Sequence, residues 1–300
     1  MTLNMSKYTP SPISNYVSFG IFPKVRRFVK TPGFRTMMIV GETGNGKTVA
    51  VEQACALEKM PMIRVNLTAD ADERLLGYYE LRNGQTEWVD GPVTVAARGG
   101  AVLLLDEEDY GGTKAAVLQA VLEGKSFLLA TGERVVPHPN FKIIATANTY
   151  GRGSDNGRYV GNQVQNEAKL DRFHICLVQQ YPTVAEEFRI LRGAVPLDVT
   201  IADDVLRQLC QWAAFIRETY ERGGCDDLMT TRRLLNLVRS LSIFDGDVHA
   251  TIDAAVARFG PVTGQAFRQY YDRLTPPSPA VSAETTTAAA VDTQSVPATV

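Results

Sequence analysis

The sequence from Met37 to Thr48 reads MMIVGETGNGKT and decides the fold that we expect for this chain. Its first four residues form an apolar run that is typical of a buried strand, and residues 49–57 (VAVEQACAL) are typical of a helix. Between them, residues 41–48 match the pattern G-x-x-x-x-G-K-[ST], in which backbone N–H groups and the start of a helix surround phosphate oxygens. The strand, loop and helix therefore predict a site for the phosphates of a nucleotide.

The residues of this loop supply different groups to the phosphates. Glycines at positions 44 and 46 let the backbone curl so that its N–H groups point inward. Lys47 would reach the β- and γ-phosphates, and the hydroxyl of Thr48 would hold Mg²⁺. The predicted nucleotide-binding set is Glu42, Thr43, Gly44, Asn45, Gly46, Lys47 and Thr48.

Length and composition restrict the class of protein. Three hundred residues, with 45% hydrophobic and 21% charged, are typical of a globular protein with one large or two ordinary domains. The net charge of −2 gives no overall attraction for nucleic acid or an anionic membrane. The four cysteines are scattered, which favours reduced thiols. Residues 1–12 lack the apolar core of a signal peptide, and no apolar run approaches the ~18 residues of a membrane span, so we expect a cytoplasmic chain.

A second motif follows another apolar strand, residues 101–105 (AVLLL). It begins with Asp106 and Glu107 and continues with Glu108 and Asp109. We predict that Asp106 holds Mg²⁺ through water and that Glu107 acts as the general base for the attacking water. An acidic cluster on its own is often a solvated loop, but this one comes directly after a buried strand. Glu108 and Asp109 receive no assignment.

Three polar residues further along the chain are candidates for completing this site. Asn148 ends the apolar strand 141–147, where it could hydrogen-bond the γ-phosphate and the attacking water, although an Asn at a strand end is often only a turn residue. Arg172 follows a helical stretch and, taken alone, is a surface residue with a local Asp partner. Arg232 lies at a helix start and could point back at the nucleotide, or it and Arg233 could be a solvated pair.

Two hairpins and a basic cluster leave alternatives open. Asn83-Gly84 within residues 79–89 predicts a hairpin inserted into a helix, and its aromatic residues either pack on the body or contact a substrate. A second hairpin is expected around Thr131-Gly132. The basic residues between 24 and 35 form either a solvated helix face beside the nucleotide pocket or a contact for nucleic acid.

The chain changes character twice. From residue 182 onward apolar residues recur at helical spacing, and after residue 274 Pro, Ser, Thr, Ala and Val dominate. We therefore expect four segments. They are an N-terminal segment (1–30), an α/β nucleotide-binding domain (31–181), a small all-α lid domain (182–274) and a disordered tail (275–300).

The order of these motifs resembles that of the AAA+ ATPases. A phosphate loop, an Asp-Glu strand, a sensor Asn, an arginine after a helix and a helical lid follow one another in that family. The two hairpins resemble those of its MoxR-like branch. Five segments are similar to the ATPase subunit of aerobic cobaltochelatase, the CobS type: GETGNGKT, IRVNLTADADERLLG, LLLDEED, VVPHPNFKIIATANT and QNEAKLDRF.

This resemblance implies a fold and a set of roles. The fold would be a P-loop AAA+ core with a parallel sheet flanked by helices, followed by the all-α lid. The ligands would be ATP and Mg²⁺. Asn148 would be the sensor, Arg172 the arginine finger that completes the site of a neighbouring subunit, and Arg232 the second sensor. A finger that acts across an interface implies a homo-oligomer, most simply a hexameric ring. The family also implies a von Willebrand-type partner protein.

Three functions remain in view at this point. The leading one is an ATP-hydrolysing ring that remodels a partner protein or complex, with cobalt chelation as one example. The second is a nucleic-acid motor or loader, and a phage-encoded MoxR-type chaperone with another target is a variant of the first. The third is a nucleotide-gated scaffold that barely hydrolyses ATP, and the presence of Glu107, Asn148 and Arg172 argues against it.

Overall fold

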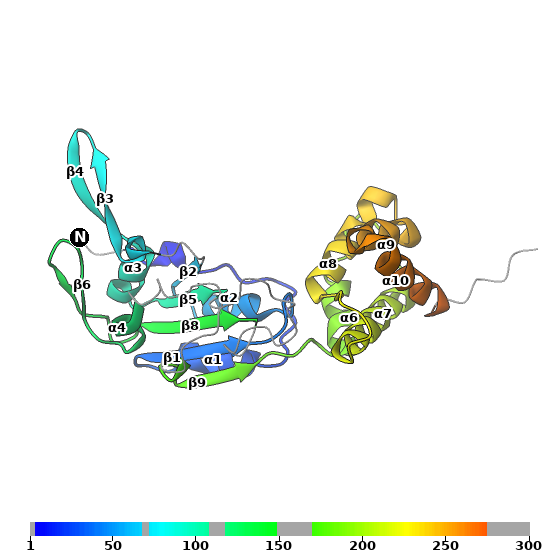
Figure 1. Ribbon diagram of the computed structural model, residues 1–300, viewed down its shortest axis with the longest axis horizontal. Coiled ribbons are helices and arrows are strands. Elements are labelled where there is room, and N and C mark those ends of the chain that lie inside the picture. Colours follow the sequence, from blue (N-terminus) through cyan, green and yellow to red (C-terminus); the bar gives the residue numbers. More distant parts are fainter. Residues whose placement is uncertain (1–3, 68–71, 108–117, 149–169, 275–300) are drawn as a thin grey trace, which may run out of the picture.

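The fold is taken from a computed structural model, which describes residues 4–67, 72–107, 118–148 and 170–274 (Figure 1). Glu108, Asp109, the first five residues of the segment QNEAKLDRF and the tail after residue 274, which was expected to be disordered, lie outside the described residues.

A five-stranded sheet forms the centre of the α/β part, in the order β2-β5-β8-β1-β9. All neighbouring strands are parallel, which confirms the predicted fold class. The three central strands are almost completely buried, as expected for parallel strands covered on both faces. The strands are β1 (Arg35–Val40), β2 (Met62–Asn66), β5 (Val102–Asp106), β8 (Lys142–Ala147) and β9 (Ile175–Val178).

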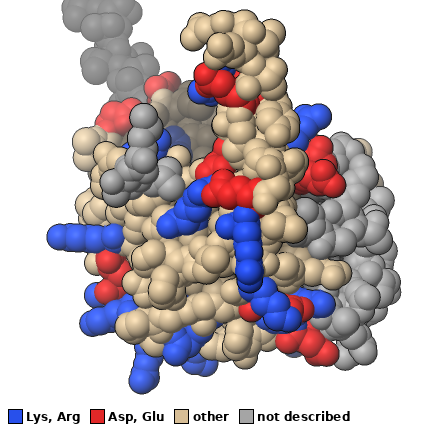
Figure 2. Space-filling model, turned by 90° about the vertical axis from the view of Figure 1, so that its left-hand side faces the viewer, with Lys and Arg blue, Asp and Glu red and all other residues tan. Residues whose placement is uncertain are grey.

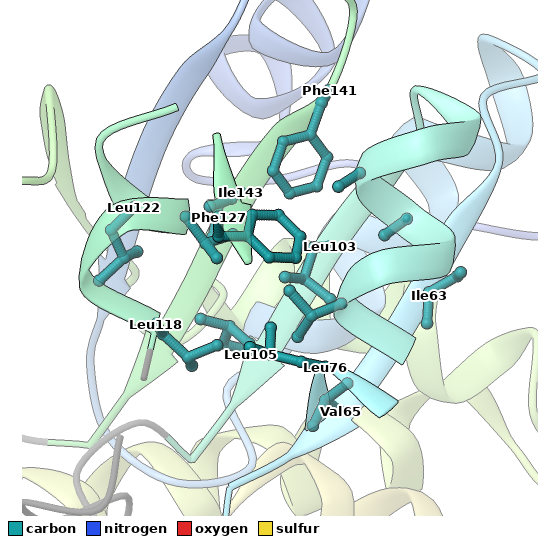
Figure 3. Packing of buried hydrophobic residues seen from close by; sticks show 14 of the residues in the cluster. Ile63, Val65, Leu76, Leu103, Leu105, Leu118, Leu122, Phe127, Phe141 and Ile143 are labelled. Atoms are coloured by element: carbon teal, nitrogen blue, oxygen red, sulfur yellow. The ribbon is translucent and has the colours of Figure 1, made fainter. Parts of the chain in front are cut away.

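Helices cover the two faces of this sheet according to the alternation of its side chains. Val102 and Leu104 pack with helices α1 (Phe22–Lys30) and α2 (Lys47–Leu57). Leu103 and Leu105 point to the other face, where they meet α3 (Pro92–Gly99), α4 (Gln119–Leu122) and aromatic residues such as Phe141 (Figure 3). Burial of each such leucine contributes about 1.5–3 kcal/mol to folding.

Helix α1 belongs to this layered unit, although the sequence analysis placed residues 22–30 in a separate N-terminal segment. Its apolar face, which includes Val25 and Phe28, packs in the same cluster as β1 and α2. Its basic residues are exposed on the opposite face, and Arg26 pairs with Glu58 of the α2 C-cap at 2.6 Å. Helix α1 therefore packs as part of the α/β unit, and the basic residues from Lys24 to Lys30 lie on its exposed face.

Both expected hairpins are present. Strands β3 (Gly77–Arg82) and β4 (Gln85–Asp90) project from the body between the short 3₁₀ helix η2 (Glu73–Leu75) and α3 (Figure 1). Positive φ angles at Asn83 and Gly84 (51° and 78°) close the turn, as the Asn-Gly pair predicts. Trp88 packs against the body, whereas Tyr79 is 54% exposed. The second hairpin is short, with β6 (Phe127–Leu128) and β7 (Arg134–Val135).

The helices after residue 182 form a separate core, referred to below as the lid (Figure 1). Trp212 lies at its centre, and its indole N–H donates to the carbonyl oxygen of Phe267 at 2.8 Å. None of the helices in the described ranges has the length and apolar character that a membrane span needs. The elements of the lid are α6 (Val184–Arg192), α7 (Asp203–Glu221), α8 (Thr231–Arg239), η5 (Ser240–Phe244), α9 (Val248–Val256), η6 (Ala257–Phe259) and α10 (Gly260–Leu274).

A buried lysine in the central sheet gives a first prediction. Lys142 is 2% exposed, its ammonium group donates to the carbonyl of Asn140, and burial together with the charge of Arg35 lowers its pKa. At pH values below 10.5, the ordinary pKa of a lysine, burying the charged form therefore costs folding free energy. We expect Lys142→Met to raise the free energy of unfolding by roughly 1 kcal/mol at pH 7.

Urea unfolding at several pH values measures this effect. The wild-type penalty should be fully present below the lowered folded pKa and should fade as the pH rises from there towards 10.5, because the amine is then neutral in both states. The advantage of the Met variant should therefore shrink over the same range. Lys24→Met, on the exposed face of α1, is the control. Equal stability of Lys142→Met and wild type at pH 7 would contradict the prediction.

Candidate active site

The loop between β1 and α2 has the backbone that its glycines permit. Gly44 and Gly46 adopt left-handed φ angles of 67° and 93°, and Gly46 is the residue that precedes the first turn of α2. The first N–H groups of a helix lack intrahelical partners, and they carry partial positive charge. The loop therefore presents the electropositive end of α2 to the space beside it.

Lys47 connects the loop to the end of the neighbouring strand β8. It is 8% exposed, and its Nζ donates to the carbonyls of Gly41 (2.5 Å) and Glu42 (2.9 Å) and to Oδ1 of Asn148 (3.2 Å). Lys47 and Asn148 are 101 positions apart in the sequence, and the parallel pairing of β1 with β8 brings them together. The predicted phosphate-binding lysine and the predicted sensor are thus direct neighbours.

Asp106, at the end of β5, is 5% exposed, and within the described part of the chain its carboxylate has three side-chain partners. The Thr48 hydroxyl donates to its Oδ1 at 3.1 Å, the Thr146 hydroxyl also donates to Oδ1, and Nη2 of Arg64 lies 2.5 Å from Oδ2. The predicted pair Thr48 and Asp106 is therefore in contact. Sequence reasoning missed Arg64 and Thr146, and the one available signal was the charged Arg64 between the apolar residues Ile63 and Val65 of β2.

These oxygen atoms suit a small divalent cation. A hydroxyl and a carboxylate are hard ligands of the kind that Mg²⁺ binds in proteins, often with few protein ligands because substrate phosphates complete the shell. The described residues contain no group of three or more His, Cys, Asp or Glu side chains that could hold a metal ion. Thr48 and Asp106 are accordingly the residues that could hold Mg²⁺ here.

Glu107 has an unusual backbone for its position. Its φ angle is 59°, in the left-handed region, and its N–H donates to the hydroxyl of Thr146 at 3.3 Å. A residue with a Cβ in this conformation costs on the order of 1–3 kcal/mol, and such strain is concentrated at functional sites. The bend turns Glu107 out of the strand, and the exposed residue lines the same cavity as Lys47.

The cavity has a volume of about 440 Å³, which falls in the range of small-molecule sites. The phosphate loop, Asp106, Glu107 and Asn148 line one side of it. The other side is more apolar and comes from two regions that sequence reasoning missed. These regions are the N-terminal segment with Ile13, Tyr16, Val17 and Phe19, and the lid residues Ile190, Ala194 and Leu235.

The N-terminal segment is fixed by contacts that no local pattern reveals. The N–H of Ile13 donates to Oε1 of Gln53 in α2 at 2.8 Å, and the ring of Tyr16 packs on Phe22 at 5.0 Å between centroids. Burial raises the pKa of the Tyr16 phenol. These residues are scattered apolar positions in a proline-containing stretch, without helical or strand periodicity, so no pattern in the sequence places them at the site.

The two predicted arginines lie in different places. Arg232 lines the cavity, and its N–H donates to the carbonyl of Gly44 at 3.3 Å. Arg172 is not among the lining residues. Its carbonyl accepts from the Thr36 hydroxyl at 2.7 Å and its Nε lies 2.9 Å from Glu123. Thr36 is near the start of β1 and the loop follows its end at Val40, so Arg172 and the loop lie near opposite ends of the strand, roughly 13 Å apart at ~3.3 Å per residue.

Comparison with known proteins agrees with this geometry. Residues 36–160 match the family described as AAA domain (dynein-related subfamily). The chain is 30% identical over 223 residues to the aerobic cobaltochelatase subunit CobS of Sinorhizobium sp, which covers 71% of this chain and 67% of that protein. It is 29% identical over 214 residues to an uncharacterized protein of Staphylococcus haemolyticus (strain JCSC1435), covering 68% and 76% of the two chains.

This chain is also similar to a solved structure from Cytophaga hutchinsonii ATCC 33406, which is named only provisionally as an ATPase. The match covers 90% of this chain and 92% of that chain. The TM-score is 0.46 and the identity 16%, which is too distant to support an inference about the site. The resemblance to the cobaltochelatase ATPase subunit that the sequence motifs indicated is confirmed by the CobS alignment.

The tight contact between loop and lid gives a second prediction. Gly44 has a φ angle of 67°, and a Cβ there would lie 2.8 Å from Thr230, the residue before α8. We expect Gly44→Ala to weaken the binding of a fluorescent ATP analogue roughly tenfold, because a left-handed residue with a Cβ costs about 1–2 kcal/mol and the lid must also move away.

Gly132→Ala is a matched control. Gly132 has a φ angle of 83° but a Cβ there would meet no atom within 4 Å, so the substitution carries backbone strain without a clash. It should lower stability without changing nucleotide affinity. If both variants bound the analogue equally well, the contact between Gly44 and the lid would have no bearing on the site.

Proposed function

This chain belongs to the AAA+ ATPases, in the dynein-related subfamily, and we propose that it hydrolyses ATP with Mg²⁺ in a ring of identical subunits that remodels a partner protein. One observation carries this proposal. Five residues line a single cavity: Lys47 and Thr48 at the start of α2, Asp106 and Glu107 at the end of β5, and Asn148 after β8. Ligands of parallel α/β sheets bind at this carboxyl edge of the strands.

The residues of the site have distinct roles in this reaction. Lys47 and the N–H groups at the start of α2 balance the charge of the β- and γ-phosphates. Thr48 and Asp106 would hold Mg²⁺, which would supply positive charge to stabilise the phosphates. Glu107 accepts the proton of the water that attacks the γ-phosphorus, and Asn148, hydrogen-bonded to Lys47, orients that water. The apolar wall with Val17, Ile190 and Leu235 accommodates the base.

The position of Arg172 supports an oligomer. It lies near the opposite end of β1 from its own phosphate loop, where Glu123 orients its guanidinium. A cation there cannot reach the γ-phosphate of its own subunit, but it can reach that of a neighbour in a closed ring. We therefore propose that Arg172 is an arginine finger and that the active form is a homo-oligomer, most simply a hexamer.

Two kinds of partner fit the relatives of this chain. The relative from Sinorhizobium is a subunit of aerobic cobaltochelatase, so assistance to a metal chelatase through a von Willebrand-type protein is the first candidate. A protein chaperone of MoxR type with another target is the second. On the face in Figure 2, Lys and Arg side chains are mixed with Asp and Glu instead of forming one basic stripe, which does not favour a nucleic-acid motor.

Two substitutions test the catalytic assignment. Lys47→Ala should abolish binding of a fluorescent ATP analogue, because the cation at the phosphates is lost. Glu107→Gln should bind the analogue as wild type does while its turnover falls roughly 10²- to 10⁴-fold, the usual contribution of a general base. Glu80→Gln, on the hairpin, is the control for the same change elsewhere. Normal turnover by Glu107→Gln would remove Glu107 from this role.

A mixing experiment tests the finger and the ring together. Arg172→Ala and Lys47→Ala should each be inactive alone. Mixed in equal amounts, they should recover roughly a quarter of wild-type turnover, because about one interface in four then joins an intact loop to an intact Arg172. Rings that form from both variants and show no recovery would argue against a finger supplied by the neighbour.

A further inference from the structure

The linker between β9 and α6, residues 179–183, is bonded to the phosphate loop at two points. The carbonyl of Gln179 accepts from Nδ2 of Asn45 at 2.6 Å, and the hydroxyl of Tyr181 donates to the carbonyl of Thr43 at 2.6 Å. Gln179 is 2% exposed, and its side-chain oxygen also accepts from the N–H of Ile21. The only covalent connection from the sheet to the lid is thus attached to the loop that would hold the phosphates.

The lid contains a buried ion pair directly beside this linker. Arg217 of α7 and Glu187 of α6 are bonded through both oxygens, at 2.9 and 2.7 Å, and their side chains are 7% and 0% exposed. The guanidinium carbon of Arg217 lies 4.2 Å from the centre of the Tyr181 ring. A further N–H of Arg217 donates to the carbonyl of Met229 at 2.7 Å. The linker, α6 and α7 therefore meet at one guanidinium.

From Glu187 the hydrogen bonds lead back to the phosphate loop. The hydroxyl of Thr231, the first residue of α8, donates to Oε1 of Glu187 at 2.6 Å. The next residue is Arg232, whose N–H donates to the carbonyl of Gly44. A closed path of contacts thus runs from Thr43 through the linker and the ion pair to α8 and returns to the loop at the adjacent residue.

We propose that Tyr181, Arg217 and Glu187 are positioning residues that couple the phosphate loop to Arg232, so that the geometry of the loop and the orientation of α8 change together. The inference rests on the proposed function, because it assigns Arg232 to the nucleotide. The physical basis of the coupling is that hydrogen bonds are directional. A buried ion pair adds little net stability compared with apolar side chains of the same volume, but its hydrogen bonds are satisfied in one arrangement only.

A purely structural role is the alternative, since Arg217 and Glu187 also lie beside the apolar core of the lid. In that case their substitution would lower the melting temperature of the lid without affecting how Arg232 acts on the nucleotide. Coupling makes a different demand, because a variant at Tyr181 must alter the effect of a variant at Arg232. A double-mutant cycle measures this difference.

The cycle combines Tyr181→Phe with Arg232→Ala in the full chain and measures ATP affinity, KM and kcat. Tyr181→Phe removes only the hydroxyl that reaches Thr43 and leaves the ring beneath Arg217, so we expect it to fold. The loss of ATP affinity caused by Arg232→Ala should be at least threefold smaller in the Phe background than in wild type. If the losses of ATP affinity in the two single variants multiply to the loss in the double variant within about twofold, the proposal is overturned.

A pair of arginine variants gives a second arm. Arg217→Lys keeps the charge but loses the planar fork, and it should raise KM and show the same interaction with Arg232→Ala. Arg207→Lys is the matched control on the same helix, because Arg207 also lies over a ring, 4.5 Å from that of Phe188, and pairs with Asp204, but is half exposed. Equal effects of the two Lys variants would overturn the proposal. If Arg217→Lys does not fold, the Tyr181 cycle decides.

Hydrogen exchange without nucleotide separates this inference from the proposed function. Tyr181→Phe should speed exchange in both the phosphate loop and the first turn of α8. Tyr270→Phe, on α10, where the ring stacks on Phe215 of α7, should leave exchange in these two segments unchanged. Faster exchange confined to the loop would overturn the coupling. A wild-type chain that failed to bind ATP, with faster exchange in both segments of Tyr181→Phe, would refute the proposed function and still support the coupling.

Discussion

The parallel pairing of β1 with β8 is the constraint on which the rest of the site depends. The two strands stay in register from Arg35 opposite Lys142 to Val40 opposite Ala147. Because they run in the same direction, the loop after Val40 and the polar residue after Ala147 leave the sheet at one edge. A shift of one residue would turn the apolar side chains of β8 to the wrong face and would also separate Asn148 from Lys47. The packing of the core therefore sets the geometry of the site.

Local sequence patterns were sufficient to predict the elements that a short stretch of chain determines by itself. The apolar runs at 37–40 and 101–105 predicted buried strands because parallel strands bury both faces, and Asn83-Gly84 predicted its hairpin because only such residues adopt the two positive φ angles. The motifs also placed Lys47, Asp106 and Asn148 at strand ends, and in a parallel sheet this suffices to bring them to one edge.

Contacts between distant segments could not be predicted in this way. The N–H of Ile13 meets Gln53 across 40 positions, and neither residue belongs to a motif that marks it. Arg64 looked like one charged residue in a short strand. The register of β2 with β5 places it opposite Leu104, and from there its long side chain reaches Asp106, two residues further along β5. For the same reason, no pattern within residues 1–30 records that α1 joins the core through packing with α2.

The lid shows why a buried ion pair lies at the junction and not in the middle of the apolar core. In the sequence, Arg217 is one more charged residue of an amphipathic helix, and only the packing of α6, α7 and the linker reveals its burial. Apolar contacts are nearly indifferent to small rotations, so Trp212 and its neighbours can hold the lid together without fixing its angle to the sheet. Hydrogen bonds from Arg217 to Glu187 and Met229 orient α6, α7 and the start of α8 relative to one another. The cation–π contact of Arg217 with the Tyr181 ring joins them to the linker, whose tyrosine hydroxyl is bonded to the phosphate loop. The ion pair of Arg217 and Glu187 is therefore buried at the junction where it can define an orientation. The element that it orients is α8, the helix that carries Arg232.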